Sequence, residues 1–169
     1  SRGADYLIIA HDDLAEAIAP LADWRRKQGL RVELAKVSDV YDEFSDGVFS
    51  PVAIRDFVDY AYHNWQQPAP QSVLLVGDAN LDYRDYYGTG AGNFVPAYMV
   101  RIRDGMETAF DGWYTTVDGK DTVPDLAIGR IPAQSPAEVR SVLNKIAAYE
   151  RSPAAAWQKK GAGREALPR

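Results

Sequence analysis

Charged side chains follow directly after apolar segments at three places in the sequence. His11, Asp12 and Asp13 come after the first such segment, Asp78 after a second and Arg130 after a third. If these segments are parallel strands, their carboxyl ends share one edge of a sheet, where the ligands of open α/β sheets collect. A structural interpretation is also open. Asp12 or Asp13 can cap a helix, and Asp78 can cap a turn. Arg130 can pair with one of these carboxylates. We favour the structural interpretation for this group.

Histidine and cysteine, frequent participants in nucleophilic catalysis, are scarce in this chain. It has two histidines, His11 and His63, and no cysteine. No Ser, Thr or Cys lies near His11 in the sequence, so a general-base role for His11 is open only in trans. His63 lies in a segment of helical period and is interpreted as a solvated surface residue. Without cysteine the chain has neither disulfides nor thiolate metal sites.

Carboxylates are dense between Asp78 and Asp125, in a region rich in turn-forming residues. Oxygen ligands on loops suit calcium, and the first candidates for a structural calcium site are Asp78, Asp82, Asp85 and Asp111. Their spacing matches no EF-hand loop. Turn formation and solubility account for most of these carboxylates, and we favour that explanation over calcium.

Composition favours one compact globular domain. The chain has 169 residues, of which 46% are hydrophobic, and its net charge of −5 combines 24 acidic with 19 basic residues. This mixed, acidic surface offers no basic footprint for nucleic acid. No apolar run approaches the roughly 20 residues that a membrane-spanning helix needs. We therefore expect neither a nucleic-acid partner nor a membrane span.

Strand-like and helical segments alternate, which predicts an α/β fold with a mostly parallel sheet of about four core strands flanked by helices, plus short antiparallel strands. The predicted core strands are 6–10, 30–37, 73–76 and 126–128. The alternating pattern of the second suggests one wetter face or an edge position. Shorter strands are expected at 95–102 and 113–117, and an irregular piece around Tyr41.

Three segments have helical period. The first covers 14–28, the second starts at Pro51 with Ser50 as its cap, and the third starts after Ser135. Ser135 and Glu138 match a capping box, in which each side chain binds the backbone N–H of the other. A long loop is expected over 79–93.

Six short pieces of the sequence resemble, in the same order, the gingipain-type cysteine peptidases. They extend over roughly 5–157 and comprise YLII from Tyr6, LADWRRKQG from Leu21, AIRDF from Ala53, VLLVGD from Val73, PDLAIGRI from Pro124 and KIAAYE from Lys145. The resemblance implies a caspase-like, Rossmann-like three-layer fold built from two subdomains, of which this chain matches the first. It also implies secretion or a place at the cell surface, and structural calcium in some members.

The family's catalytic residues, a His in a His-Gly pair and a nucleophilic Cys, belong to the second subdomain and have no counterpart in this sequence. We therefore expect residues 1–152 to form the N-terminal subdomain, 153–169 to be a tail or the start of a link to a catalytic subdomain, and the chain alone to be inactive.

Two functions fit these observations. In the first, the chain supports the catalytic subdomain of a cysteine endopeptidase that cleaves proteins or peptides, and its loops shape the substrate cleft. In the second, it is a degenerate, non-catalytic protein-interaction module on the same scaffold. If a second subdomain normally continues this sheet, the isolated chain exposes a strand edge or an apolar strip, and we expect it to self-associate.

Overall fold

The computed structural model describes residues 3–80, 82, 86–88 and 92–152. Its elements follow one another as β1 (Tyr6–Ala10), α1 (Asp12–Lys27), β2 (Val32–Lys36), α2 (Val37–Ser45), α3 (Pro51–Asn64), β3 (Ser72–Val76), β4 (Met99–Arg101), η1 (Arg103–Gly105), β5 (Glu107–Ala109), η2 (Asp111–Thr115), β6 (Ala127–Ile131) and α4 (Pro136–Arg151).

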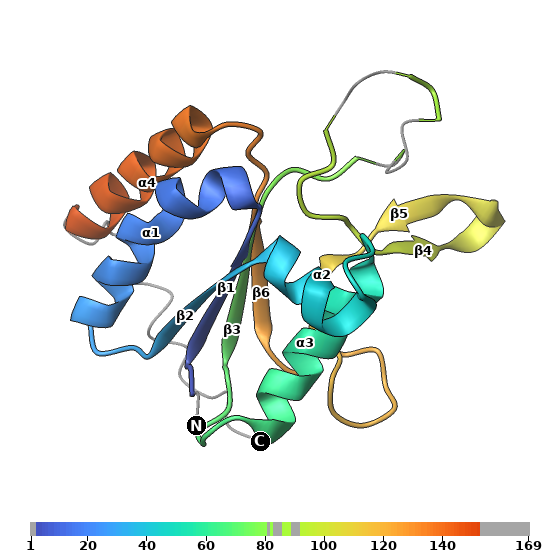
Figure 1. Ribbon diagram of the computed structural model, residues 1–169, viewed down its shortest axis with the longest axis horizontal. Coiled ribbons are helices and arrows are strands. Elements are labelled where there is room, and N and C mark those ends of the chain that lie inside the picture. Colours follow the sequence, from blue (N-terminus) through green and yellow to red (C-terminus); the bar gives the residue numbers. More distant parts are fainter. Residues whose placement is uncertain (1–2, 81, 83–85, 89–91, 153–169) are drawn as a thin grey trace, which may run out of the picture.

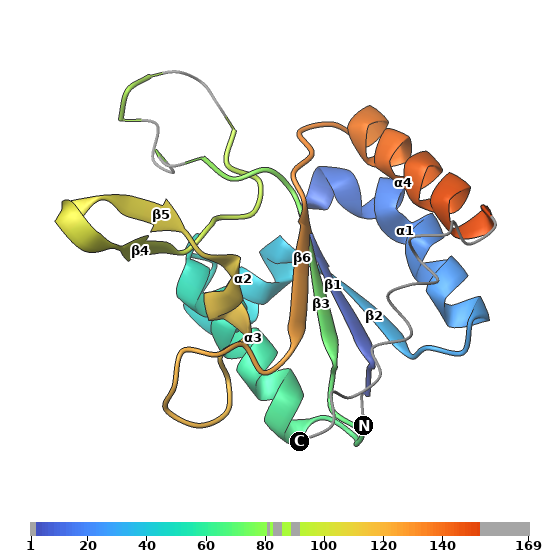
Figure 2. The same cartoon turned by 180° about the vertical axis from the view of Figure 1, so that it is seen from behind.

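The main sheet has four parallel strands in the order β2-β1-β3-β6. Helices α1 and α4 cover one face, while α2 and α3 cover the other (Figures 1 and 2). The central strands β1 and β3 are buried on both faces, which explains why their sequences are continuous apolar runs. The α/β fold with a mostly parallel sheet is therefore confirmed, as is the edge position of β2.

Two apolar clusters lie on the two faces of the sheet. Alternate residues of β1 divide between them, so that Leu7 and Ile9 pack toward α2 and α3, and Ile8 packs toward α1. This alternation follows from the two-residue period of a strand. The cluster beside α1 also includes Val139, the one residue of α4 that is fully buried.

The helix starts follow local hydrogen-bonding chemistry, with two corrections. Ser50 caps α3 as predicted, because its Oγ accepts the backbone N–H of Val52. The cap of α1 is His11 rather than Asp12 or Asp13, since the backbone N–H of Asp13 donates to His11 Nδ1. At α4, Ser135 Oγ accepts the N–H of Glu138, but the Glu138 carboxylate accepts the N–H of Gln134 in place of the expected Ser135 N–H.

Several predicted elements were wrong. The expected irregular piece around Tyr41 is helix α2, and the expected strand at 113–117 overlaps the 3-10 helix η2. In the 95–102 segment only Met99–Arg101 forms a strand, and it pairs antiparallel with the unpredicted β5. Helix α2 buries Val37, Val40 and Tyr41, which recur at helical spacing. It packs against α3 through the aromatic pair of Phe44 and Phe57, whose ring centroids lie 5.6 Å apart.

Among the described strands, β6 lies at an edge of the sheet and pairs only with β3. It continues to Ile131, so Arg130 lies inside the strand and not after it. Ala127 and Gly129 are exposed, and a side chain added at Gly129 would meet open space. The face of β6 that carries these two residues is therefore uncovered in the described part of the chain.

Candidate functional site

Arg130 forms the centre of a polar network at the carboxyl end of the sheet. Its Nε and Nη2 atoms donate to the two carboxylate oxygens of Asp111, both at 2.7 Å. Nη1 donates to the carbonyls of Gly77 and Val95, at 2.8 and 2.7 Å, and Nη2 also donates to that of Pro96, at 3.0 Å. Every N–H of the guanidinium is thus used within the protein. Arg130 is a structural residue that ties β3, the segment after the long loop and η2 to β6.

The structural interpretation of Asp78 is confirmed, and that of Arg130 is corrected. Asp78 Oδ1 accepts the N–H of Ala79, as in a turn cap, and Oδ2 accepts the side-chain amide of Gln134. Arg130 does pair with a carboxylate, but this carboxylate belongs to Asp111 and not to the residues after β1 or β3. The partner is the first residue of η2.

Gly77 allows the chain to turn tightly where β3 ends. Its φ is +148°, and a Cβ there would lie 2.8 Å from Phe94 Cβ and 2.9 Å from Val95 Cγ2. Because the side chain is absent, the segment around Phe94 can return to the end of β3, where the N–H groups of Phe94 and Val95 both donate to the carbonyl of Asp78.

A cavity of about 180 Å³ opens beside this network, at the carboxyl ends of β1 and β2. Its lining combines a carboxylate, an imidazole, two hydroxyls and an amide with aromatic and aliphatic side chains: His11, Asp12, Val37, Ser38, Tyr41, Phe49, Asn93 and Phe94. Sequence analysis singled out His11 and Asp12 and missed Ser38 and Tyr41.

Tyr41 is the most unusual residue of this cavity. The residue is 7% exposed, and its hydroxyl has no hydrogen-bond partner among the residues that the structure describes. Burial raises the pKa of Tyr41, with a smaller opposing effect from the charge of Arg130, so the hydroxyl stays neutral. Nearby, Ser38 Oγ donates to Asp12 Oδ1 at 2.6 Å.

The two histidines lie in different places. His11 packs edge-on against Phe94 with ring centroids 4.7 Å apart, next to the cavity. His63 is partly exposed, as expected for a surface residue, but its Nε2 also lies 3.0 Å from the carbonyl oxygen of Val117. Together with Arg55, which donates to the carbonyl of Thr116, it fixes the end of η2 to α3.

Three of the predicted calcium ligands, Asp78, Asp82 and Asp111, accept hydrogen bonds from the protein. Asp111 has both oxygens on Arg130, and Asp82 accepts the N–H of Tyr87 through Oδ2. The part of the chain that the structure describes contains no group of three His, Cys, Asp or Glu side chains able to hold a metal ion. Asp85 lies outside the described residues, so calcium binding stays a prediction.

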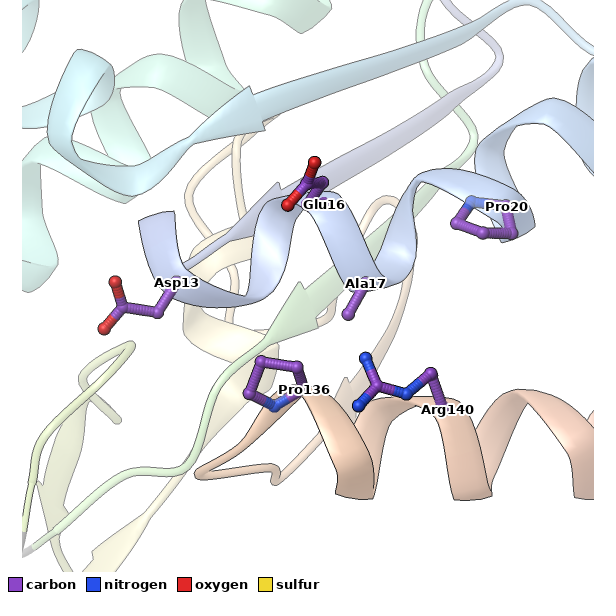
Figure 3. Close-up of a pocket in the computed structure, with 6 residues that line it drawn as sticks. All are labelled: Asp13, Glu16, Ala17, Pro20, Pro136 and Arg140. Carbon is purple, nitrogen blue, oxygen red and sulfur yellow. The ribbon is translucent and has the colours of Figure 1, made fainter.

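Two further grooves lie on the helical layers. One, of about 250 Å³, runs between α1 and α4 and is lined by Asp13, Glu16, Ala17, Pro20, Pro136 and Arg140. Figure 3 shows Arg140 reaching from α4 toward Ala17 of α1. The other, of about 140 Å³, lies between β2 and α2 and carries the carboxylates of Glu33, Asp39 and Glu43.

Comparison with known proteins places this architecture in a family. The model of peptidase family C25 matches residues 1–162. Lys-gingipain of Porphyromonas gingivalis is 23% identical over 150 residues, and gingipain R2 of the same organism is 27% identical over 149 residues; both alignments cover 86% of this chain. The crystal structure of dimeric latent PorU from P. gingivalis aligns with 89% of the present chain, and this alignment covers 16% of the PorU chain. Its TM-score is 0.70 and the sequence identity is 24%.

The chain therefore belongs to peptidase family C25, the gingipain-type cysteine peptidases. It spans 7% of the length of Lys-gingipain and 17% of that of gingipain R2. None of the described helices has the length and apolar character needed to cross a membrane.

Proposed function

We propose that this chain is the N-terminal supporting subdomain of a gingipain-like cysteine endopeptidase that acts on proteins or peptides. In this proposal residues 1–152 form the subdomain, and 153–169 are a tail or the start of a link to a catalytic subdomain that supplies the nucleophilic Cys and its His. The intact enzyme would be secreted or lie at the cell surface, as the family resemblance implies.

The observation that carries the proposal is the edge strand β6, whose outer side no described strand covers. This chain belongs to a cysteine peptidase family and has no cysteine of its own. An unpaired strand edge favours pairing with another segment of chain. The exposed Ala127 and Gly129 leave room for a neighbour on the face of β6 as well. The network around Arg130 would hold this edge rigid and position the loops that border the cleft.

Peptide-cleavage assays test whether catalysis requires the second subdomain. The purified chain, assayed on a mixed peptide library with a reducing agent, should show no cleavage, because it has no thiol to form an acyl-enzyme. Co-expression with the segment encoded downstream should restore thiol-dependent cleavage. Thiol-dependent cleavage by the chain alone, retained through further purification, would contradict the proposal.

A non-catalytic interaction module is the second candidate, and the same uncovered strand supports it. The reading frame beyond residue 169 separates the two. A His-Gly pair followed by a Cys would favour the role as a supporting subdomain. A stop codon directly after Arg169 would favour the non-catalytic interaction module.

A further inference from the structure

The hairpin formed by β4 and β5 projects from the body of the molecule. Figures 1 and 2 show it extending past α2 and α3, away from the main sheet, and every residue from 101 to 109 is exposed. We call residues 99–109 the arm. Among the described strands, its two strands pair only with each other. A lone two-stranded hairpin is marginally stable in water, so a partner that covers it would stabilise it.

The arm has a defined shape at its tip and at its base. At the tip, Asp104 and Gly105 have φ values of +66° and +76°, the left-handed conformation that tight turns between two strands favour. At the base, the N–H of Phe110 donates to the carbonyl of Tyr98, whose ring stacks on that of Trp113 with centroids 3.7 Å apart. An arm that is already ordered loses little conformational entropy when it binds.

The two faces of the arm differ in polarity. Successive residues of a strand point to opposite faces, and the register pairs Arg101 with Glu107 on one of them. The other face consists of Val100, Ile102, Met106 and Thr108. On this apolar face Ile102 is 45% exposed and Met106 59%. Exposed apolar surface that is bordered by charged residues is typical of interaction sites.

The charges of the arm favour a second copy of this chain as the partner. The arm carries two positive and two negative side chains: Arg101, Arg103, Asp104 and Glu107. Within the part of the chain that the structure describes, none of the four has an ion pair or a side-chain hydrogen bond. A two-fold interface brings one surface against itself, and a surface with balanced charges can complement itself. The rest of the chain carries the net charge of −5, so the arm adds nothing to the repulsion between two copies.

We propose that the arms of two copies stack with their apolar faces together across a two-fold axis and form a weak dimer. Two stacked ribbons make a small two-layer core and leave Arg101 and Glu107 in water. Two arms are too small to bury the area of a stable complex, so the dimer forms only at high protein concentration. This contact differs from pairing at the edge of β6 and does not depend on the supporting role toward a catalytic subdomain.

Sedimentation of the full 169-residue chain tests the contact in a Gly129→Lys background, in which a charge on the open face of β6 opposes association there. We expect Gly129→Lys to form dimers and nothing larger, because an isologous contact closes on itself. Adding Ile102→Thr and Met106→Thr, which keeps a strand-forming residue at both positions, should weaken dimerisation at least about tenfold. Adding Val123→Thr, at another exposed apolar residue with 64% accessibility, should leave dimerisation unchanged.

Chemical cross-linking tests which face is buried. The chain has no cysteine, so a single introduced thiol identifies its neighbour in the second copy. A short bismaleimide, which two thiols join by addition, should link copies of Thr108→Cys at least about tenfold faster than copies of Glu107→Cys, whose side chain lies on the opposite face. Equal rates, a strictly monomeric Gly129→Lys chain, growth beyond dimers, or undiminished dimerisation after the two arm substitutions would each overturn the proposal.

Discussion

Two buried tyrosines illustrate how differently the same hydroxyl can act. The hydroxyl of Tyr114 donates to the carbonyl of Pro96 at 2.7 Å, whereas the hydroxyl of Tyr41 finds no partner within the described part of the chain. Removing the hydroxyl should therefore have opposite effects at the two positions. We expect Tyr41→Phe to raise the free energy of unfolding by about 1 kcal/mol and Tyr114→Phe to lower it by about 1 kcal/mol. Urea denaturation measures the free energy of unfolding of both variants. A loss of stability in Tyr41→Phe would mean that ordered water already satisfies the hydroxyl.

Arg130 should be among the positions where a single substitution lowers the free energy of unfolding most. Arg130→Met would leave the Asp111 carboxylate and the carbonyls of Gly77 and Val95 without their shared donor. Breaking such a partly buried charge pair from one side costs about 3–5 kcal/mol. Arg130→Lys keeps the charge but not the planar guanidinium, and should lower the free energy of unfolding by less. Urea unfolding of the two variants checks the order, and a Met variant as stable as wild type would contradict the assigned role.

At the scale of elements, Asp5 and Arg31 tie the starts of β1 and β2 together. Arg31 donates to both carboxylate oxygens of Asp5 and also to the carbonyl of Pro68, just before β3. The side-chain hydrogen bonds from Arg31 hold the pKa of Asp5 below its ordinary value of 3.8. The folded state therefore keeps the carboxylate charged where the unfolded chain would protonate it.

This shift predicts a loss of stability in acid. The contribution of the pair is fully present above the ordinary pKa and is lost as pH falls below 3.8 through the lowered pKa of the folded state. Urea unfolding at pH 6 and pH 3 should show a smaller acid loss in Asp5→Asn and in Arg31→Gln than in wild type. An undiminished acid loss in both variants would show that the pair does not couple folding to pH.

The sequence could predict those elements whose burial follows from a local pattern of residues. Strands β1 and β3 are continuous apolar runs, and Ser50 with Pro51 marks a helix start without reference to anything distant. Helix α2 could have been found, because Val37, Val40, Tyr41 and Phe44 recur at helical spacing. Strand β5 is exposed along its length and carries no such pattern.

The candidate site was predictable only in part. His11 and Asp12 follow β1 directly, so the topology of a parallel sheet is enough to draw attention to them. The pairing of Arg130 with Asp111 joins residues 19 positions apart through η2, which was expected to be a strand. The isolation of the Tyr41 hydroxyl depends on every neighbour around it, and no sequence pattern records an absent partner.

At the scale of the whole molecule, the open edge of β6 should make the isolated chain associate with itself. Gly129→Lys tests this, since the new side chain would enter open space on the uncovered face and place a charge there. We expect concentration-dependent sedimentation of the wild-type chain, and a shift toward monomer in Gly129→Lys without loss of stability.

Val48→Lys is the matched control for that experiment. It places the same charge on an exposed apolar residue, 63% accessible, in the segment between α2 and α3. Its association should equal that of wild type. A wild-type chain that stays monomeric at high concentration would contradict self-association through the edge of β6.

The bonds of Arg130 also have a consequence for how the fold opens. One guanidinium bridges residue 77 at the end of β3, residues 95 and 96, residue 111 in η2, and β6 itself. Opening at residue 77, 95, 96 or 111 therefore breaks bonds that also hold the last strand of the sheet. Amide hydrogens next to these anchor points should accordingly exchange with solvent only as rarely as the molecule unfolds.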